Sequence, residues 1–304
     1  TLMRSSAASD VYKRQVLLVR YFASMAAGAR TLSPKRRTWT DKISYLAGGY
    51  MNDRLKDKVI VISGGTKGVA RYAVRALAES GAYVFFSGRD AAAAQGVLDS
   101  LRELRDRAEF VATDLRSLSS CKALFDAAAQ RFGHIDGFIN YSGNVSASSL
   151  IECSEETFDT IFDINVKAAF FCCQYAIKNM GDQGGSIVLC GSPHAWGGEI
   201  DRAAYTVSKG ALMTLSEHIA KNYADKNIRC NHLVMGWTMT EGEMALRSSK
   251  GQTEQQLRDM VSDIVPMGRI IEADEYIPML IFLMSDDSKI MTGATLRMTG
   301  GLYI

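Results

Sequence analysis

Three polar side chains in the middle of the chain have the types and the spacing of a site that moves protons. Tyr205 and Lys209 stand four residues apart in the run YTVSK, which places both side chains on one face of a helix. An ammonium beside a phenol favours the phenolate, so this phenol is suited to exchange a proton with a carbonyl or alcohol oxygen. Ser192 follows an apolar run and is placed to hold that same oxygen by a hydrogen bond. A Tyr-Lys pair alone is common by chance, and it is the added serine at a strand end that favours chemistry.

A glycine-rich turn near residue 65 indicates a second part of the site. Val59 to Ile62 form a short β-branched run that predicts a buried strand, and the residues from 69 to 79 have the period of an amphipathic helix. Glycines stand between them at positions 64, 65 and 68. Backbone N–H groups at the start of such a helix bind the pyrophosphate of a dinucleotide. A structural turn without a ligand is the alternative interpretation of this stretch taken alone.

The elements that must position these residues alternate along the chain. Strands are predicted at 59–62, 82–86, 109–112, 136–140, 185–190, 227–235 and 295–298, and helices at 69–79, 90–107, 119–132, 154–180, 203–224 and 273–284. We expect the less regular segment 238–265 to act as a lid over a substrate. The alternation predicts an α/β fold, a Rossmann-like doubly wound single domain with a mainly parallel seven-stranded sheet flanked by helices. Ligands of such a sheet bind at the carboxyl ends of its strands.

The composition excludes several classes of protein. The chain is 47% hydrophobic and 22% charged, as in ordinary globular proteins, and it has no apolar run long enough to cross a bilayer. Residues 1–50 hold nine Lys or Arg against two Asp, a charge of +7, which leaves −5 for the rest of a chain of net charge +2. We therefore expect neither a nucleic-acid partner nor a membrane partner. The six cysteines include no CxxC pair, which favours buried thiols in a reducing compartment, without disulfides or a metal site.

The first fifty residues differ in character from the remainder. Residues 1–15 have no hydrophobic period, and the run SAASDVYKRQ resembles translated sequencing-adaptor sequence. Residues 16–50 are basic, and MNDRLKDK from Met51 leads directly into the first predicted strand. We interpret 1–50 as a non-native or disordered extension and 51–304 as the functional domain. A cytoplasmic location is expected, or a mitochondrial one if 16–50 are a native presequence.

These motifs together resemble those of the short-chain dehydrogenase/reductase family over about residues 55–304. Gly64-x-x-x-Gly68-x-Ala70 resembles the family's glycine turn, and YTVSK resembles its YxxxK motif. The resemblance implies hydride transfer between a carbonyl and an alcohol, with Tyr205 as acid/base and Lys209 as its partner and a ribose contact. It implies that Ser192 orients the substrate and that Asn165 holds a proton-relay water.

The resemblance also implies a nicotinamide dinucleotide and its contacts. The implied cofactor-binding residues are Gly64, Thr66, Lys67, Gly68, Val69, Arg89, Asp114, Leu115, Asn140, Tyr205, Lys209, Gly236 and Thr240. Ser87 is taken as the end of the second strand, where an NAD-preferring site has an acidic residue, and Arg89 and Lys67 are suited to bind a 2′-phosphate. We therefore expect NADP(H), with NAD as the less favoured cofactor. The alternative is that both cations are solvated surface charges.

Departures from the family pattern leave the substrate open. Tyr141-Ser142 replaces the middle of the family's NNAG motif, Met235 replaces a proline, and Thr299 replaces an aspartate. The expected partner is a small carbonyl or alcohol, and the resemblance implies a homo-oligomer, dimer or tetramer, formed through helices 154–180 and 203–224. A nucleotide-binding regulatory or scaffold protein on the same fold is the alternative function, although it would have no need of all four catalytic side chains.

Overall fold

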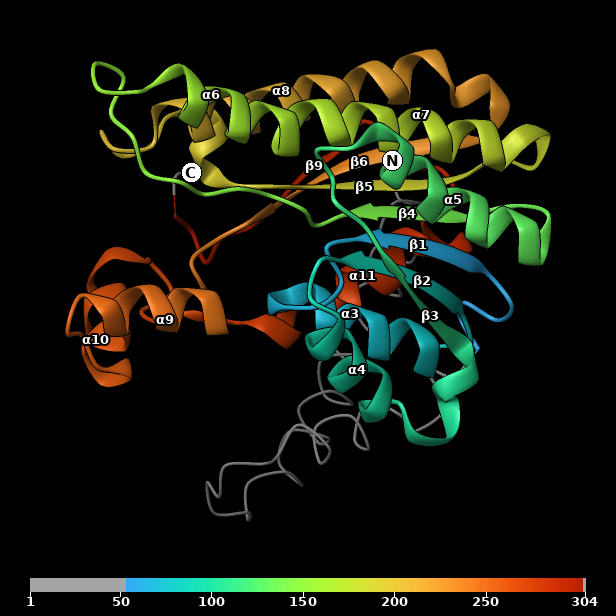
Figure 1. Cartoon of the computed structure of the whole chain (residues 1–304), viewed down its shortest axis with the longest axis horizontal. Coiled ribbons are helices and arrows are strands. Elements are labelled where there is room, and N and C mark those ends of the chain that lie inside the picture. The colour runs from blue at the N-terminus through green and yellow to red at the C-terminus, as the bar shows by residue number, and fades with distance from the viewer. Residues whose placement is uncertain (1–52, 303–304) are drawn as a thin grey trace, which may run out of the picture. The chain divides into compact units, whose positions relative to one another are not determined.

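A parallel sheet forms the centre of the structure, a computed structural model that describes residues 53–302. Our predictions for residues 1–50 lie outside these residues. The strands follow the order β3-β2-β1-β4-β5-β6-β9, and every neighbouring pair is parallel (Figure 1). They are β1 (Val59–Ser63), β2 (Tyr83–Gly88), β3 (Ala108–Ala112), β4 (Gly137–Asn140), β5 (Gly185–Gly191), β6 (Ile228–Met235) and β9 (Thr295–Met298). The predicted Rossmann-like, doubly wound class is confirmed.

Helices cover both faces of this sheet (Figure 1). One face carries α3 (Gly68–Glu79), α4 (Ala91–Ser100) and α11 (Ile277–Met284), and the other carries α5 (Leu118–Phe132), α6 (Glu155–Phe162), α7 (Ala168–Met180) and α8 (Ala203–Asn222). Three of them begin at a side-chain cap, since Asp90, Ser117 and Ser154 each accept a backbone N–H from the first turn. A helix–sheet–helix sandwich follows, with its apolar side chains inside.

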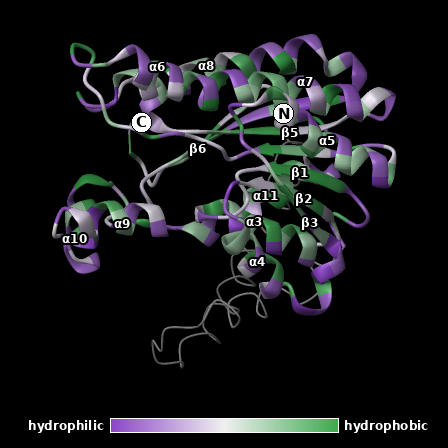
Figure 2. Ribbon diagram, viewed as in Figure 1, coloured by the Kyte–Doolittle hydropathy of each residue, from purple (hydrophilic) through white to green (hydrophobic). Residues whose placement is uncertain are grey.

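The core lies where the central strands meet the helices. All five residues of β1 are buried, and Phe85 of β2 and Phe138 of β4 pack with Leu124 and Phe125 of α5. Figure 2 shows the central strands as the most hydrophobic part of the molecule and polar residues on the outer sides of the helices. Because both faces of a parallel sheet are covered, its strands read as continuous apolar runs. This is why the strand predictions were accurate.

The structure corrects three predicted elements. The helix predicted at 90–107 ends at Ser100. A 3₁₀ turn, Arg102–Arg107, follows, and its first residue, Arg102, has a left-handed φ of 51°. Helix 154–180 is interrupted by a π-helical turn, Asp163–Lys167. The segment 238–265 is mostly helical: after the short strand β7 (Thr238–Met239), which pairs with β8 (Ile271–Glu272), it forms α9 (Glu241–Ser249) and α10 (Glu254–Ile264).

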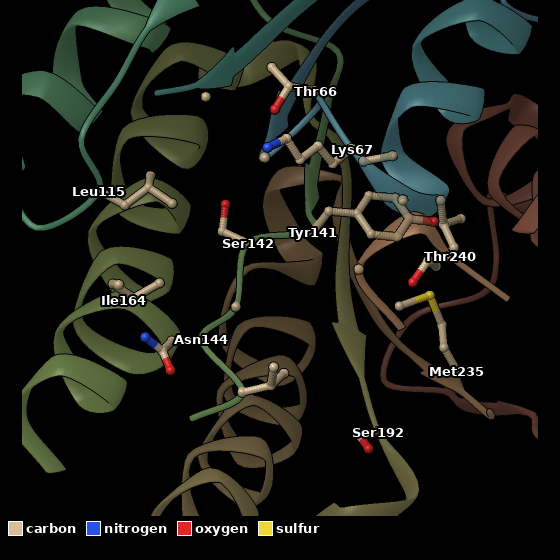
Figure 3. Close-up of a pocket in the computed structure, with 18 of the residues that line it drawn as sticks. Thr66, Lys67, Leu115, Tyr141, Ser142, Asn144, Ile164, Ser192, Met235 and Thr240 are labelled. Atoms are coloured by element: carbon tan, nitrogen blue, oxygen red, sulfur yellow. The ribbon is translucent and has the colours of Figure 1, made fainter. Parts of the chain in front are cut away.

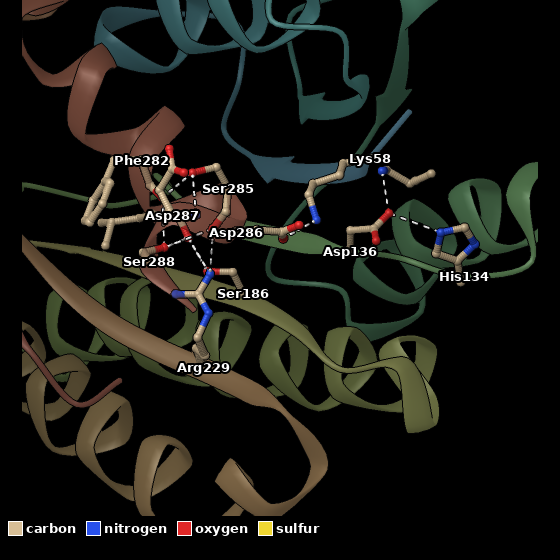
Figure 4. A network of polar contacts seen from close by, with 12 residues as sticks. Lys58, His134, Asp136, Ser186, Arg229, Phe282, Ser285, Asp286, Asp287 and Ser288 are labelled. Carbon is tan, nitrogen blue, oxygen red and sulfur yellow. Dashed lines mark hydrogen bonds and ion pairs between the residues drawn. The ribbon is translucent and has the colours of Figure 1, made fainter. Parts of the chain in front are cut away.

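A polar network connects the elements at the amino-terminal ends of the strands (Figure 4). The Arg229 guanidinium donates to the carbonyl oxygens of Leu283, Ser285 and Met291, so that it joins β6 to the end of α11. Lys58 pairs with Asp286 at 2.9 Å, beside the start of β1. These groups satisfy one another, and we assign them a structural role at the end of the sheet opposite to the predicted site.

Candidate active site

A cavity of about 580 Å³ opens at the carboxyl ends of the strands, and most of the predicted site residues line it. Those are Gly64, Thr66, Lys67, Gly68, Val69, Arg89, Asp114, Leu115, Ser192, Tyr205, Lys209, Gly236 and Thr240. Figure 3 shows Thr66 and Lys67 at one end of the cavity and Ser192 at the other. The fold thus places the glycine turn and the proton-moving residues in one elongated site, whose volume suits a small molecule.

The glycine turn has the geometry of an anion-binding loop. Gly64 and Gly68 have φ angles of +80° and +58°, a region that side chains other than glycine rarely adopt. A Cβ on Gly65 would lie 2.6 Å from Cβ of Phe86, so the backbone can pass there only as glycine. Helix α3 begins at Gly68, and the side chain of the preceding residue, Lys67, does not cap it; instead, the Glu241 carboxylate accepts the Gly68 N–H at 3.2 Å. Gly68 and Val69 line the cavity, so the positive end of the helix dipole lies at the cavity.

The end of β2 differs from the prediction. The strand continues to Gly88, which pairs with Ala112, and Ser87 is fully buried with its Oγ accepting the Gly64 N–H at 3.2 Å. An acidic residue at the strand end would therefore replace Gly88 rather than Ser87. A Cβ on Gly88 would lie 2.6 Å from Cγ2 of Thr66, so a side chain at position 88 would clash with Thr66.

Cations and carboxylates alternate around the same end of the cavity. Lys67 pairs with Asp90 at 3.1 Å, and the pKa of Asp90 is lowered, first by the Ala93 N–H and then by Lys67. Hydrogen bonds from Arg116 lower the pKa of Asp114 to about 2. Arg89 is exposed and lines the cavity, and it has no ion pair or hydrogen bond within residues 53–302. Arg89 is thus the cation of this group that is best able to take up an anion.

Tyr205 and Lys209 lie on the first turns of α8 and face the cavity. The Lys209 Nζ lies 5.6 Å from the centre of the Tyr205 ring and donates to the Cys190 carbonyl at 3.1 Å. Lys209 is buried, whereas Tyr205 is half-buried and open to the cavity. Ser192 directly follows β5, and its Oγ accepts the His194 N–H at 3.3 Å. The strand end and the helix therefore hold a hydroxyl, a phenol and an ammonium around one space.

The two predicted asparagines do not line the cavity. The Oδ1 of Asn140 accepts from Ser63 at 2.8 Å, so Asn140 joins β4 to β1. Asn165 is fully buried in the π-helical turn, and its amide binds both backbone groups of Asn144 and the hydroxyl of Ser208. A Cβ on Gly143 would lie 3.7 Å from both Asn165 Oδ1 and Lys209 Nζ. The Asn165 amide thus fixes the loop beside Lys209.

Sequence reasoning missed several residues of the site. The cavity is also lined by Thr113, Tyr141, Ser142, Asn144, Val145, Ile164, Met235 and Thr238. Tyr141 is the most unusual, since burial raises the pKa of its phenol well above the ordinary value, with a further contribution from the neighbouring Cys190. The sequence held a signal for them, because each of these positions lies at or shortly after the carboxyl end of a strand of the central sheet, or adjoins Asn165.

His194 packs on the outer side of Tyr205. The two rings meet edge to face at 5.4 Å, and the His194 Nε2 lies 2.9 Å from a carboxylate oxygen of Glu199. Burial lowers the pKa of His194, against the opposing effect of Glu199. This pair supports the phenol from behind and lies outside the lining of the cavity.

Residues 53–302 contain neither a metal-binding cluster nor a membrane-spanning helix. Within this range, no group of three or more His, Cys, Asp or Glu side chains is arranged to hold a metal ion. No helix in the same range combines the length and the apolar character that a bilayer span requires.

Comparisons with known proteins match the whole described domain. Residues 64–303 match the profile of the family described as enoyl-(acyl carrier protein) reductase. An uncharacterized oxidoreductase of Thermotoga maritima is 31% identical over 247 residues, which cover 80% of this chain and 96% of that protein. A 3beta-hydroxysteroid dehydrogenase of Mediterraneibacter gnavus is 27% identical over 84% of this chain and 98% of its own length.

A solved structure agrees with the fold. The structure of a double mutant of a Serratia marcescens short-chain dehydrogenase/reductase superposes with a TM-score of 0.75 at 25% sequence identity. The superposition covers 83% of this chain and all of that one. The similarity thus extends over the sheet, the helices and the site.

Proposed function

Since this chain belongs to the short-chain dehydrogenase/reductase family, whose members act on CH–OH groups with NAD(P), we propose that it interconverts a small carbonyl and an alcohol with a preference for NADP(H). The observation that carries this proposal is the single cavity that Ser192, Tyr205 and Lys209 line together with the residues of the glycine turn. The residues fit a dinucleotide, because the first residues of α3, Gly68 and Val69, line the cavity and Gly64 and Gly68 have the left-handed φ angles of a phosphate cradle.

Each side chain then has a separate task. When bound, the nicotinamide supplies or accepts the hydride. Tyr205 gives its proton to the carbonyl oxygen, or takes it from the alcohol, and Ser192 holds the same oxygen by a hydrogen bond. Lys209 stabilises the phenolate that remains, through its charge. Asn165 acts as a positioning residue, since it fixes the loop at Asn144 and the hydroxyl of Ser208 near Lys209.

The second candidate, a nucleotide-binding scaffold, uses the same glycine turn but needs no proton donor. A scaffold has no need of a phenol at the cavity, Tyr205, with the buried Lys209 ammonium 5.6 Å from the centre of its ring. Burial of a charge is costly, and its retention here favours chemistry. The two candidates differ in one result: an enzyme turns over a carbonyl or alcohol substrate, whereas a scaffold binds the dinucleotide only.

We predict that the protein binds NADPH about tenfold more tightly than NADH, and that Arg89→Ala removes most of this difference. Arg89 is exposed at the cavity without a partner in residues 53–302, and Thr66 covers Gly88, where an acidic residue would otherwise repel a 2′-phosphate. The discriminating position is therefore Gly88 rather than Ser87, because a carboxylate at position 87 would be buried.

Titration of both reduced cofactors by the fluorescence of the nicotinamide measures these affinities. Lys122→Ala is the control, because Lys122 is an exposed cation of α5 that pairs with Asp126 and does not line the cavity. Equal affinity of the parent protein for the two cofactors would refute the preference for NADP(H).

We further propose that residues 51–304 contain the functional domain and that they assemble as a homo-oligomer. Leu55 is fully buried and donates its N–H to Ser80, so the packed domain begins shortly after residue 51. Apolar side chains are exposed on α7 and α8, among them Phe170 and Val207.

A chain of residues 51–304 should therefore keep the melting temperature, the activity and the oligomeric mass of the full chain. Thermal melting, turnover and light scattering of the two proteins test this. A loss of stability on deletion would show that residues 1–50 support the domain, and a monomeric mass at micromolar concentration would contradict the assembly.

A further inference from the structure

A carboxylate of the lid lies on the proposed pyrophosphate site. The Glu241 Oε2 accepts the backbone N–H of Gly68, the first residue of α3, at 3.2 Å. Its other oxygen, Oε1, pairs with Arg71 of the same helix at 2.9 Å. Glu241 thus places a negative charge where the helix dipole and the free N–H groups of α3 favour an anion.

The backbone of Glu241 is fixed by its surroundings. Thr240 caps α9 by accepting the Glu243 N–H, and its Cγ2 would lie 3.6 Å from a Cβ on Gly68. The Glu243 carboxylate accepts hydrogen bonds from Trp237 at 2.9 Å and from Arg247 at 2.8 Å. These hydrogen bonds hold the start of α9 against the glycine turn, and the Glu241 side chain projects from it toward α3.

We propose that Glu241 is a built-in competitor of the cofactor, whose carboxylate must leave the N-terminus of α3 before the pyrophosphate of a dinucleotide can bind there. The inference rests on the proposed function, which places the pyrophosphate at this helix end. Two anionic groups repel each other at contact distance, and one N–H group cannot serve both. Cofactor binding is thereby coupled to movement of the Glu241 side chain away from Gly68 and Arg71.

The competition has a defined signature. The pyrophosphate is common to NADPH and NADH, so Glu241 lowers the affinity for both cofactors by the same factor. Arg89 and Thr66 would set the ratio between the cofactors at the other end of the dinucleotide, and Glu241 does not touch them. A change at Glu241 should therefore move both dissociation constants and leave their ratio unchanged.

The test is a titration of NADPH and NADH against the parent, Glu241→Gln and Asp259→Asn proteins. Glutamine keeps the shape of Glu241 but loses the charge and the ion pair with Arg71, so both cofactors should bind about fivefold more tightly, as expected for a half-exposed ion pair and one charge-assisted hydrogen bond. Asp259 is an exposed carboxylate of α10 outside the cavity, and its loss changes the net charge equally. We expect the Asp259→Asn protein to bind as the parent does.

Inorganic pyrophosphate supplies a second readout that requires no nicotinamide. It should raise the melting temperature of the Glu241→Gln protein at lower concentrations than it does for the parent. Unchanged or weaker cofactor binding by Glu241→Gln, or an equal gain in Asp259→Asn, would overturn the competition. If the parent and the variant both fail to bind either dinucleotide, the proposed function itself is wrong, and the role of Glu241 falls with it.

Discussion

We expect replacement of Tyr205 by phenylalanine to lower kcat about 10²–10⁴-fold and to leave the dissociation constant of the cofactor within about twofold of the parent value. The phenol is half-buried at the cavity wall and faces the buried Lys209 ammonium. Its proton is needed when the carbonyl oxygen gains negative charge, so the lost interaction belongs to the transition state rather than to the bound state. The loss should therefore appear in kcat, with little change in binding.

Tyr223→Phe is the matched control for this variant. Tyr223 stands at the opposite end of α8, directly after Asn222, and it does not line the cavity. Removal of its hydroxyl should leave kcat unchanged. Steady-state turnover of both variants, together with cofactor titration, measures the effect, and a Tyr205→Phe protein with kcat within about tenfold of the parent would contradict the acid/base role.

Acidification from about pH 7 to about pH 4.5 should cost the domain about 2.5 kcal/mol of unfolding free energy through His232 alone. Burial lowers the pKa of this imidazole from 6.5 to about 4, and the charge of Lys209 adds to the effect. His232 is fully buried on β6, and neither ring nitrogen has a hydrogen-bond partner in residues 53–302. A Cβ on Gly191 would lie 2.0 Å from its Nε2, so the ring packs directly on the backbone of Gly191.

The sign of this effect follows from where the proton binds. Below pH 6.5 the unfolded chain takes up a proton at this imidazole, whereas the folded chain does so only near pH 4. The stability contributed by the neutral ring is complete above pH 6.5 and is lost as the pH falls to 4. The carboxyls of Asp114 and Asp286 have lowered pKa values, so their contributions are lost only at still lower pH, through and below 3.8.

Urea unfolding at the two pH values measures the loss. His232→Leu should have a smaller dependence on pH over this range, because the buried titrating group is gone. His218→Gln removes an exposed imidazole of α8 and should keep the parent dependence. A parent-like dependence in the His232→Leu protein would show that other groups control the acid sensitivity.

The strands and the proton-moving residues could be read from the sequence because each leaves a local signal. The strands β1, β2, β4, β5 and β6 are mostly buried and therefore appear as apolar runs, and the edge strand β9 has the predicted bounds. Tyr205 and Lys209 are close in the chain, so their spacing alone places them on one face of α8.

The features that escaped prediction depend on partners distant in sequence. Helices α9 and α10 have polar sequences and begin at threonine caps, Thr240 and Thr253, rather than at an apolar stripe. The end of β2 is set by pairing of Gly88 with Ala112, and the π-helical turn at Asn165 is held by Asn144 and Ser208. Glu241 reaches Gly68 across 173 residues of chain, and no local pattern indicates such a contact.

Transfer of deuterium from the cofactor to a product tests the central claim most directly. The protein would be incubated with NADPH labelled at the nicotinamide C4 and with a panel of ketones, sugars and 3-oxoacyl thioesters, and the products would be analysed by mass spectrometry. Our account predicts an alcohol that carries one deuterium on the former carbonyl carbon with the parent protein, and far less of it with Tyr205→Phe. Tight binding of NADPH without deuterium transfer to any of these carbonyls would contradict it and would favour the scaffold.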